Sequence, residues 1–382
     1  MERLYRAFFQ RLPVRQVRTD NHLELLNPDE SAYIQRVHRR AMAMAALLDV
    51  AAYLLYYLPF YSFPQLFPRA SLTLPLAGPI TLRWGEYAWA VVVTVAEIYA
   101  LVLLNIAGVH EIGVGTGYLT PETKPERTSQ AIRISLTYQP RTASRYGIDP
   151  YQGANRWVLF LFLALARLKG WIGNRLIQYS LANLLGRFAL HILVDFAGMP
   201  LYMALNAWAT NTVLREARVI IMGQAIVDSL VRRLPLSQLP PDGQIMLYDT
   251  LQYIAIGKRD YHQNHDLLTE RLMQRFEVPI EKYHYVSANY LELLNQRNDA
   301  TGRLCRLVLI LGYILDGRVT RRERWQIERL NRLGILSERY DDVRRYCQDF
   351  VGGAGVEALM RRYLEGSDPE MQLIGLKSGF QP

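Results

Sequence analysis

Two long apolar runs in the first third of the chain constrain its fold more than any other feature. They cover residues 41–63 and 87–110, and a helix needs about 20 residues to cross the hydrocarbon core of a bilayer. Each run carries one acid near its middle, Asp49 in the first and Glu97 in the second. We therefore expect residues 41–110 to form a two-helix transmembrane hairpin, with both acids inside the membrane.

Basic residues flank the two runs unevenly. Eight arginines precede the first run and six lysines or arginines follow the second before residue 157, whereas the connection holds only Arg69 and Arg83. Because the cytoplasmic flanks of membrane proteins carry the excess of Lys and Arg, both termini are predicted to be cytoplasmic. Aromatic side chains, which favour the membrane interface, support this orientation at the opposite ends of both runs. They are Tyr56, Tyr57, Phe60, Tyr61, Phe63, Trp84, Tyr87 and Trp89.

The segment before the first run, residues 1–40, is predicted to be a basic, amphipathic, cytoplasmic lead-in. Residues 1–19 place apolar side chains at helical spacing, which is typical of a helix that lies on the inner leaflet. Asn27, Pro28 and Glu30 then match the start of a helix with a capping box. The formal net charge of +9 comes almost wholly from arginine, and arginine-rich flanks suit anionic lipid headgroups. Because acids and bases are interspersed after residue 210, we expect no nucleic-acid partner.

The middle of the chain is less regular. Residues 111–156 are rich in glycine and proline, which predicts a linker. Residues 157–234 have the pattern of an amphipathic or hydrophobic helical region, in which Arg187, His191 and Asp195 share one face of a helix. These three residues form either a polar stripe packed against the membrane or neighbouring helices, or an intramembrane ionisable relay. The sequence leaves open whether this region crosses the membrane.

The C-terminal region, residues 240–382, has a helical pattern throughout and is long enough to form its own core. An apolar helix ends at Asp316, and an amphipathic helix begins after Thr320, where Glu323 completes a capping box. This arrangement resembles the Asp-Gly-x-Val-x-x-x-Glu helix–turn–helix of the TerB-like domains, small all-helical bundles named from tellurite resistance. The second helix is predicted to bury a stripe made by Trp325, Ile327, Leu330 and Leu333.

A second resemblance lies in the middle region. The stretches Gly186 to Pro200 and Asn206 to Arg218 resemble the core of the EcsC family, which are bacterial membrane-associated proteins. The two apolar runs, the helical pattern and these two resemblances together predict an all-α protein of the bacterial inner (cytoplasmic) membrane, with a transmembrane hairpin and a cytosolic TerB-like bundle.

A near-repeat of the Asp-Gly turn lies earlier in the C-terminal region, where Lys258 aligns with Asp316 and His265 with Glu323. In TerB-like domains, paired acids at these turns are a proposed cation site, and here one half lacks them. We therefore expect Glu323 to act as a helix cap, and we expect no cofactor. The remaining metal candidates are Asp316, Glu323, His262 and His265. As ligands, the two histidines would need a third donor such as His284.

No catalytic motif occurs in the chain, so we expect a protein that is not an enzyme. The favoured function is a membrane scaffold or sensor that presents its cytosolic domain to a protein partner, in envelope or stress physiology. The alternative is a transport or channel subunit that uses Asp49, Glu97 and the 187–195 stripe, and it requires a homo-oligomer because two helices cannot enclose a pore. A metal-dependent enzyme is the third hypothesis, for which the sequence offers no complete site.

Overall fold

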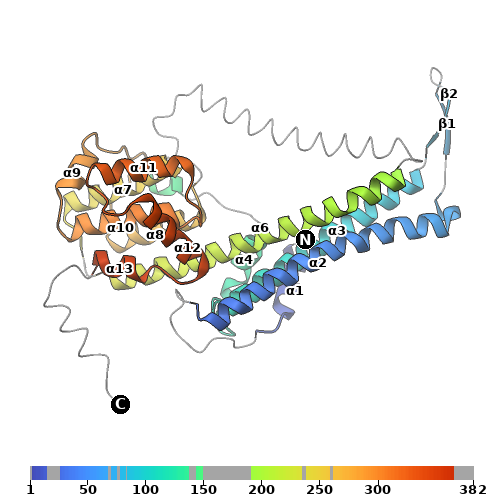
Figure 1. Ribbon diagram of the computed structural model, residues 1–382, viewed down its shortest axis with the longest axis horizontal. Coiled ribbons are helices and arrows are strands. Elements are labelled where there is room, and N and C mark those ends of the chain that lie inside the picture. The colour runs from blue at the N-terminus through green and yellow to red at the C-terminus, as the bar shows by residue number, and fades with distance from the viewer. Residues whose placement is uncertain are drawn as a thin grey trace, which may run out of the picture.

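The computed structural model describes most of the chain, and the described part is almost entirely helical (Figure 1). It has an elongated stem, made by α2, α3 and the first half of α6, and a C-terminal domain, made by the second half of α6 with α7 to α13. The described residues are 2–14, 26–67, 70–74, 78–82, 84–136, 143–148, 191–234, 238–258 and 261–364.

Two antiparallel helices form most of the stem. Helix α2 (Pro28–Ser62) starts as predicted, with Pro28 in its first turn and the Glu30 carboxylate accepting the Asn27 backbone N–H at 2.8 Å. Helix α3 (Trp84–Gly115) returns alongside it. A hairpin of β1 (Ala70–Leu74) and β2 (Gly78–Leu82) connects them at the end of the stem farthest from the C-terminal domain (Figure 1).

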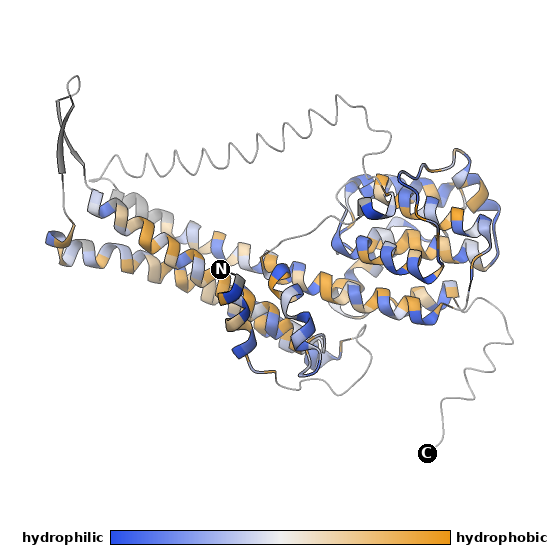
Figure 2. Cartoon of the chain, turned by 180° about the vertical axis from the view of Figure 1, so that it is seen from behind, coloured by the Kyte–Doolittle hydropathy of each residue, from blue (hydrophilic) through white to orange (hydrophobic). Residues whose placement is uncertain are grey.

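Both stem helices are long and apolar enough to span a membrane. Only 11% of the most apolar window of either helix is buried inside the protein. A helix in the core of a soluble protein buries its apolar side chains, whereas few of these are buried. Figure 2 shows apolar residues, in orange, along the stem. The exposed apolar belt includes Met44, Leu47, Leu54, Leu55, Leu58, Tyr61, Val91, Val92, Val95, Ile98, Tyr202, Leu205 and Trp208.

Helix α6 (His191–Arg233) joins the stem to the C-terminal domain without a break. Its first half packs against α2 and α3, where Gly108 gives room to Leu214. Its second half belongs to the core of the C-terminal domain. The predicted boundary near residue 240 therefore divides a single core, to which α6 contributes Val219, Met222, Ile226, Val227 and Leu230, followed by Leu234.

The predicted lead-in and linker contain further helices, which pack on the protein. They are α1 (Glu2–Arg11), α4 (Lys124–Ser135) and a short 3-10 helix, η2 (Ala143–Tyr146). Helix α1 buries Phe9 edge-on against His110 of α3, and Lys124 donates to the Leu12 carbonyl oxygen at 2.5 Å. The aromatic face expected to lie on the leaflet thus contacts α3 and α4 instead.

The C-terminal domain is built around α10, of which nearly every side chain after Arg303 is buried. Helix α11 departs from the predicted stripe, because Ile327 and Leu330 are buried whereas Trp325 is 71% exposed and Leu333 is 46% exposed. The helices are α7 (Pro241–Lys258), α8 (Gln263–Arg275), α9 (Tyr290–Gln296), α10 (Ala300–Ile314), α11 (Arg321–Arg332), α12 (Tyr340–Gly352) and α13 (Glu357–Leu364).

Both cysteines lie in this domain as free, buried thiols. Burial raises the pKa of Cys305 and of Cys347 to about 12. The two thiols are therefore protonated at neutral pH and offer no reactive thiolate.

Candidate functional site

The two halves of the near-repeat begin their second helices in the same way. At α11, the Thr320 backbone N–H donates to Glu323 Oε2 at 2.6 Å, and the Glu323 N–H donates to Thr320 Oγ1 at 3.4 Å. This confirms the predicted capping box. At α8, in the earlier half, the His262 backbone N–H donates to His265 Nδ1 at 3.2 Å. Histidines thus cap the first half where Thr and Glu cap the second.

Lys258, the last residue of α7, places its ammonium between the two acids of the other half. Its Nζ lies 2.9 Å from Asp316 Oδ2, 2.6 Å from Glu323 Oε1 and 3.1 Å from the Tyr313 carbonyl oxygen. The Lys258 side chain is only 2% exposed. An ammonium has three N–H donors, and each has an acceptor here. A lysine of the chain itself therefore occupies the space that the TerB-like resemblance would give to a cation.

Lys258, Asp316 and Glu323 form a buried ionic centre. Burial raises the pKa of Asp316 above its usual value, although the Lys258 charge opposes the shift. The neighbouring His265 Nε2 donates to the Gly312 carbonyl oxygen at 2.8 Å. Because its Nδ1 already accepts an N–H, the ring is neutral. Burial, and then the charges of Lys258 and His262, hold the pKa of His265 well below its usual value.

The metal candidates do not assemble into a site. His262 accepts the Asn264 N–H at Nδ1, so its Nε2 donates to Glu216 of α6 at 2.7 Å. His284 lies with Asp249 and Glu281 instead. Within the described residues, no group of three or more His, Cys, Asp or Glu side chains is arranged to hold a metal ion. His262 and His265 are also both buried.

His284 fastens the loop after α8 to α7. Its Nε2 lies 2.8 Å from Asp249 Oδ1 and its Nδ1 2.9 Å from Glu281 Oε2, and its ring stacks on Tyr248 at 3.8 Å. Burial alone would lower the pKa of His284, but its hydrogen bonds to the two carboxylates raise it overall. This arrangement stabilises an imidazolium between two acids and is structural in character.

Asn264 connects the ionic centre to α6. Its Nδ2 donates to the carbonyl oxygens of Val219 at 2.9 Å and Leu315 at 2.7 Å. Gly223 makes this approach feasible, because a Cβ at that position would lie 2.0 Å from Asn264 Nδ2. The helix that enters the stem is thus bonded directly to the first turn of the near-repeat and, through Asn264, to the second.

A second polar cluster lies within the stem. Asp49 of α2 is hydrogen-bonded to Glu97 of α3, and Asn206 of α6 donates to Glu97 Oε1 at 2.9 Å. The structure thus brings together the two predicted acids and adds an amide from a third helix. Of the predicted stripe, Arg187 lies outside the described residues. His191 and Asp195 lie in the first turns of α6, and their side chains are outside the description.

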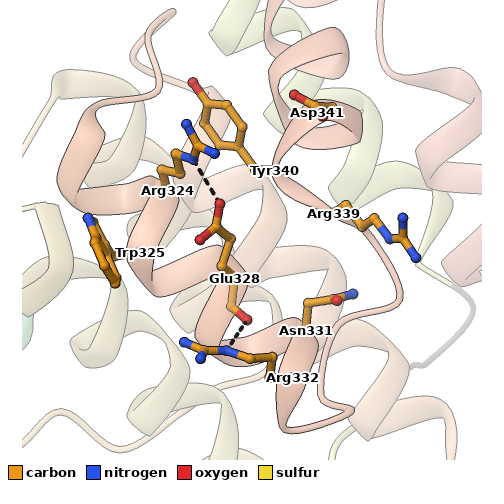
Figure 3. A pocket seen from close by; sticks show the side chains of 8 residues that line it. All are labelled: Arg324, Trp325, Glu328, Asn331, Arg332, Arg339, Tyr340 and Asp341. Carbon is orange, nitrogen blue, oxygen red and sulfur yellow. Dashed lines mark hydrogen bonds and ion pairs between the residues drawn. The ribbon is translucent and has the colours of Figure 1, made fainter.

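A surface cleft of about 380 Å³ lies between α11 and the start of α12 (Figure 3). Arg324 pairs with Glu328 at 2.8 Å and lies over the Tyr340 ring at 5.0 Å. Trp325 stands at the edge with its ring exposed. The sequence pattern did not predict this surface, because it placed Trp325 in the buried stripe. The lining residues are Arg324, Trp325, Glu328, Asn331, Arg332, Arg339, Tyr340 and Asp341.

Neither the models of known protein families, nor curated protein sequences, nor solved structures match this chain. The resemblances to TerB-like domains and to the EcsC family therefore stay predictions.

Proposed function

We propose that the protein is a scaffold or sensor of the bacterial inner membrane that presents its C-terminal domain to a cytosolic partner. The exposed apolar belt of the stem carries the proposal. From Met44 to Tyr61 it spans about 26 Å at 1.5 Å per residue, close to the ~30 Å of a hydrocarbon core. A soluble monomer rarely exposes a continuous apolar surface of such extent.

The belt also includes the first half of α6, where Tyr202, Leu205 and Trp208 are exposed. Asn206 contacts Glu97, so this half lies at the same depth as the hairpin. Ile148 belongs to the core of the C-terminal domain, whereas His191 begins α6 near the far end of the stem. In our proposal α6 therefore also crosses the membrane, with His191 on the outer side and the C-terminal domain in the cytoplasm.

Reporter fusions test this topology. A reporter that is active only outside the cytoplasm should give signal when fused after residue 77 or residue 190, because the proposed topology places both outside the cytoplasm. The same reporter fused after residue 382 should be silent, with equal expression checked by immunoblot. Signal at residue 382 would contradict the orientation, and silence at residue 190 would show that α6 does not cross.

The cleft beside Trp325 is the surface that best fits a protein partner. Trp and Arg are the residues most enriched among binding hot spots, and here three arginines surround an exposed tryptophan. Two acids also line the cleft, so its net charge is positive. We therefore propose that the partner presents an acidic segment with an apolar side chain.

Affinity capture with the full-length protein in detergent tests this surface. Trp325→Ala is expected to reduce recovery of the partner at least tenfold, since a hot-spot truncation costs about 2 kcal/mol or more. Tyr285→Ala is the matched control, because Tyr285 is 70% exposed on the same domain but lies outside the cleft. Equal losses in both variants, or loss only in the control, would contradict the assignment.

The cluster of Asp49, Glu97 and Asn206 favours a second candidate, an oligomeric transport or channel subunit. Ionisable residues inside a membrane often mark ion or substrate pathways. Glu97→Gln separates the candidates, because glutamine keeps the shape and hydrogen-bonding capacity but not the proton chemistry. The scaffold proposal expects the variant to express, fold and function normally. A large loss of function at normal expression would favour transport.

A further inference from the structure

A second cleft, of about 300 Å³, lies where α2 and α3 leave the apolar belt toward the C-terminal domain. The segment after α1 forms one wall, with Leu12 and Pro13, and the two stem helices form the others. Arg40 borders the cleft one turn of α2 before Met44, the first residue of the belt. In a membrane-inserted stem, this is the level of the lipid phosphates on the cytoplasmic side.

The cleft carries polar groups of both charges. Arg40 is exposed and makes no ion pair or hydrogen bond with any other described residue. His110 is 2% exposed, and its Nε2 has no hydrogen-bond partner in the described part of the chain. Glu111 supplies a carboxylate, which accepts the Tyr33 hydroxyl at 3.3 Å. Because His110 is buried beneath Phe9, the accessible charged groups of the cleft are Arg40 and Glu111.

We propose that this cleft binds the headgroup of an aminophospholipid. Arg40 donates to the phosphodiester, and Glu111 accepts from the primary ammonium. The inference rests on the membrane insertion proposed above, and the acyl chains would then lie along the belt beside Met44, which is 45% exposed. The volume is at the lower end of ligand pockets, which suits a headgroup rather than a large cofactor.

The charges favour a zwitterionic headgroup with N–H donors over the alternatives. A purely anionic headgroup would place its phosphate near the Glu111 carboxylate without bringing a cation to balance that charge. Like charges in a partly desolvated site repel each other. A choline headgroup has a positive charge but no N–H to donate to Glu111. Phosphoethanolamine supplies both the anion and the three donors.

Lipid binding by the delipidated full-length protein in detergent tests the proposal. Thermal shift is measured against dihexanoyl phosphatidylethanolamine, phosphatidylglycerol, phosphatidylcholine and free O-phosphoethanolamine, because a ligand that binds only the folded state raises the melting temperature. Dihexanoyl phosphatidylethanolamine is expected to bind about tenfold more tightly than phosphatidylglycerol and phosphatidylcholine, the ratio that one charge-assisted contact provides. It should also bind more tightly than free O-phosphoethanolamine, which has the same charged groups but no acyl chains to lie along the belt.

Three variants with wild-type circular dichroism assign the contacts. Arg40→Gln should weaken binding of phosphatidylethanolamine about tenfold, as expected for one lost charge-assisted hydrogen bond. Glu111→Gln should remove its advantage over phosphatidylglycerol. Arg39→Gln is the matched control, because this neighbouring arginine is exposed and lies outside the cleft, and it should bind like the wild type.

Several results would overturn the proposal. They are equal or tighter binding of phosphatidylglycerol, an unchanged preference in Glu111→Gln, or equal losses in Arg39→Gln and Arg40→Gln. Free O-phosphoethanolamine binding as tightly as the lipid would replace the lipid with a soluble phosphoester. Failure of the membrane proposal is seen separately, because the protein would then be recovered in the soluble fraction before any lipid is added.

Discussion

Replacing Lys258 with methionine is expected to destabilise the C-terminal domain by about 3–5 kcal/mol, the usual cost of removing one partner from a buried ion pair. Methionine fits a buried site of similar length but leaves Asp316 and Glu323 without a counter-charge. Both acid side chains are at most 5% exposed, so water cannot replace the ammonium. Thermal unfolding of the purified full-length protein, followed by circular dichroism, measures the loss.

Two further variants separate the charge effect from other causes. Lys282→Met is the matched control, because Lys282 is an exposed lysine of the same domain, and it should change the melting temperature little. The triple variant Lys258→Met, Asp316→Asn and Glu323→Gln should recover most of the stability, since no uncompensated charge stays buried. A triple variant as unstable as the single one would show that packing of the lysine, rather than its charge, is what matters.

The same experiment addresses the cation site that the TerB-like resemblance implies. The wild-type melting temperature should not respond to EDTA, because the Lys258 ammonium already satisfies the acids. If EDTA lowered it, and Glu323→Ala abolished that sensitivity, the capping role and the lysine contact would both be insufficient and a bound cation would have to be present.

The sequence shows that Lys258 and Asp316 occupy equivalent positions of the near-repeat, but it does not show that the two side chains contact each other. The offset that aligns the two turns of the near-repeat is also the separation of this bonded pair along the chain. An internal repeat becomes a contact only when its two halves pack face to face, which is a property of the assembled bundle. The capping boxes are local, because each involves residues three apart, and for that reason the one at Thr320 was predictable.

Trp325 shows how a pattern can mislead. Residues two apart in a helix lie about 200° apart around its axis, so Trp325 and Ile327 cannot both face one core. Because Ile327 is buried, Trp325 is exposed, although its large apolar side chain suggested burial. The contact of Asn206 with Glu97 was hidden for another reason, since it joins residues 109 positions apart in sequence and depends on how α6 packs on the hairpin.

The domain boundary leads to the prediction with the largest expected effect. A fragment of residues 240–382 lacks the part of α6 that completes the core, and we expect it to be molten or insoluble. The missing side chains include Met222, Ile226, Val227 and Leu230, all at most 1% exposed in the intact protein. Burial of one such side chain contributes about 1.5–3 kcal/mol, so four of them approach the whole stability of a typical domain, about 5–15 kcal/mol.

A fragment of residues 211–364 is the matched comparison, because it restores this half of α6 and the contacts of Glu216 with His262 and of Val219 with Asn264. It should melt cooperatively, whereas the shorter fragment should show helical circular dichroism without a sharp transition and should bind a hydrophobic dye. If residues 240–382 melted cooperatively at a similar temperature, α6 would only rest on a finished domain. If residues 240–382 did not melt cooperatively, α6 would be part of both the stem and the C-terminal domain, and the two could not move independently. A structural change at Glu97 or Asn206 would then be transmitted to the ionic centre through one continuous helix.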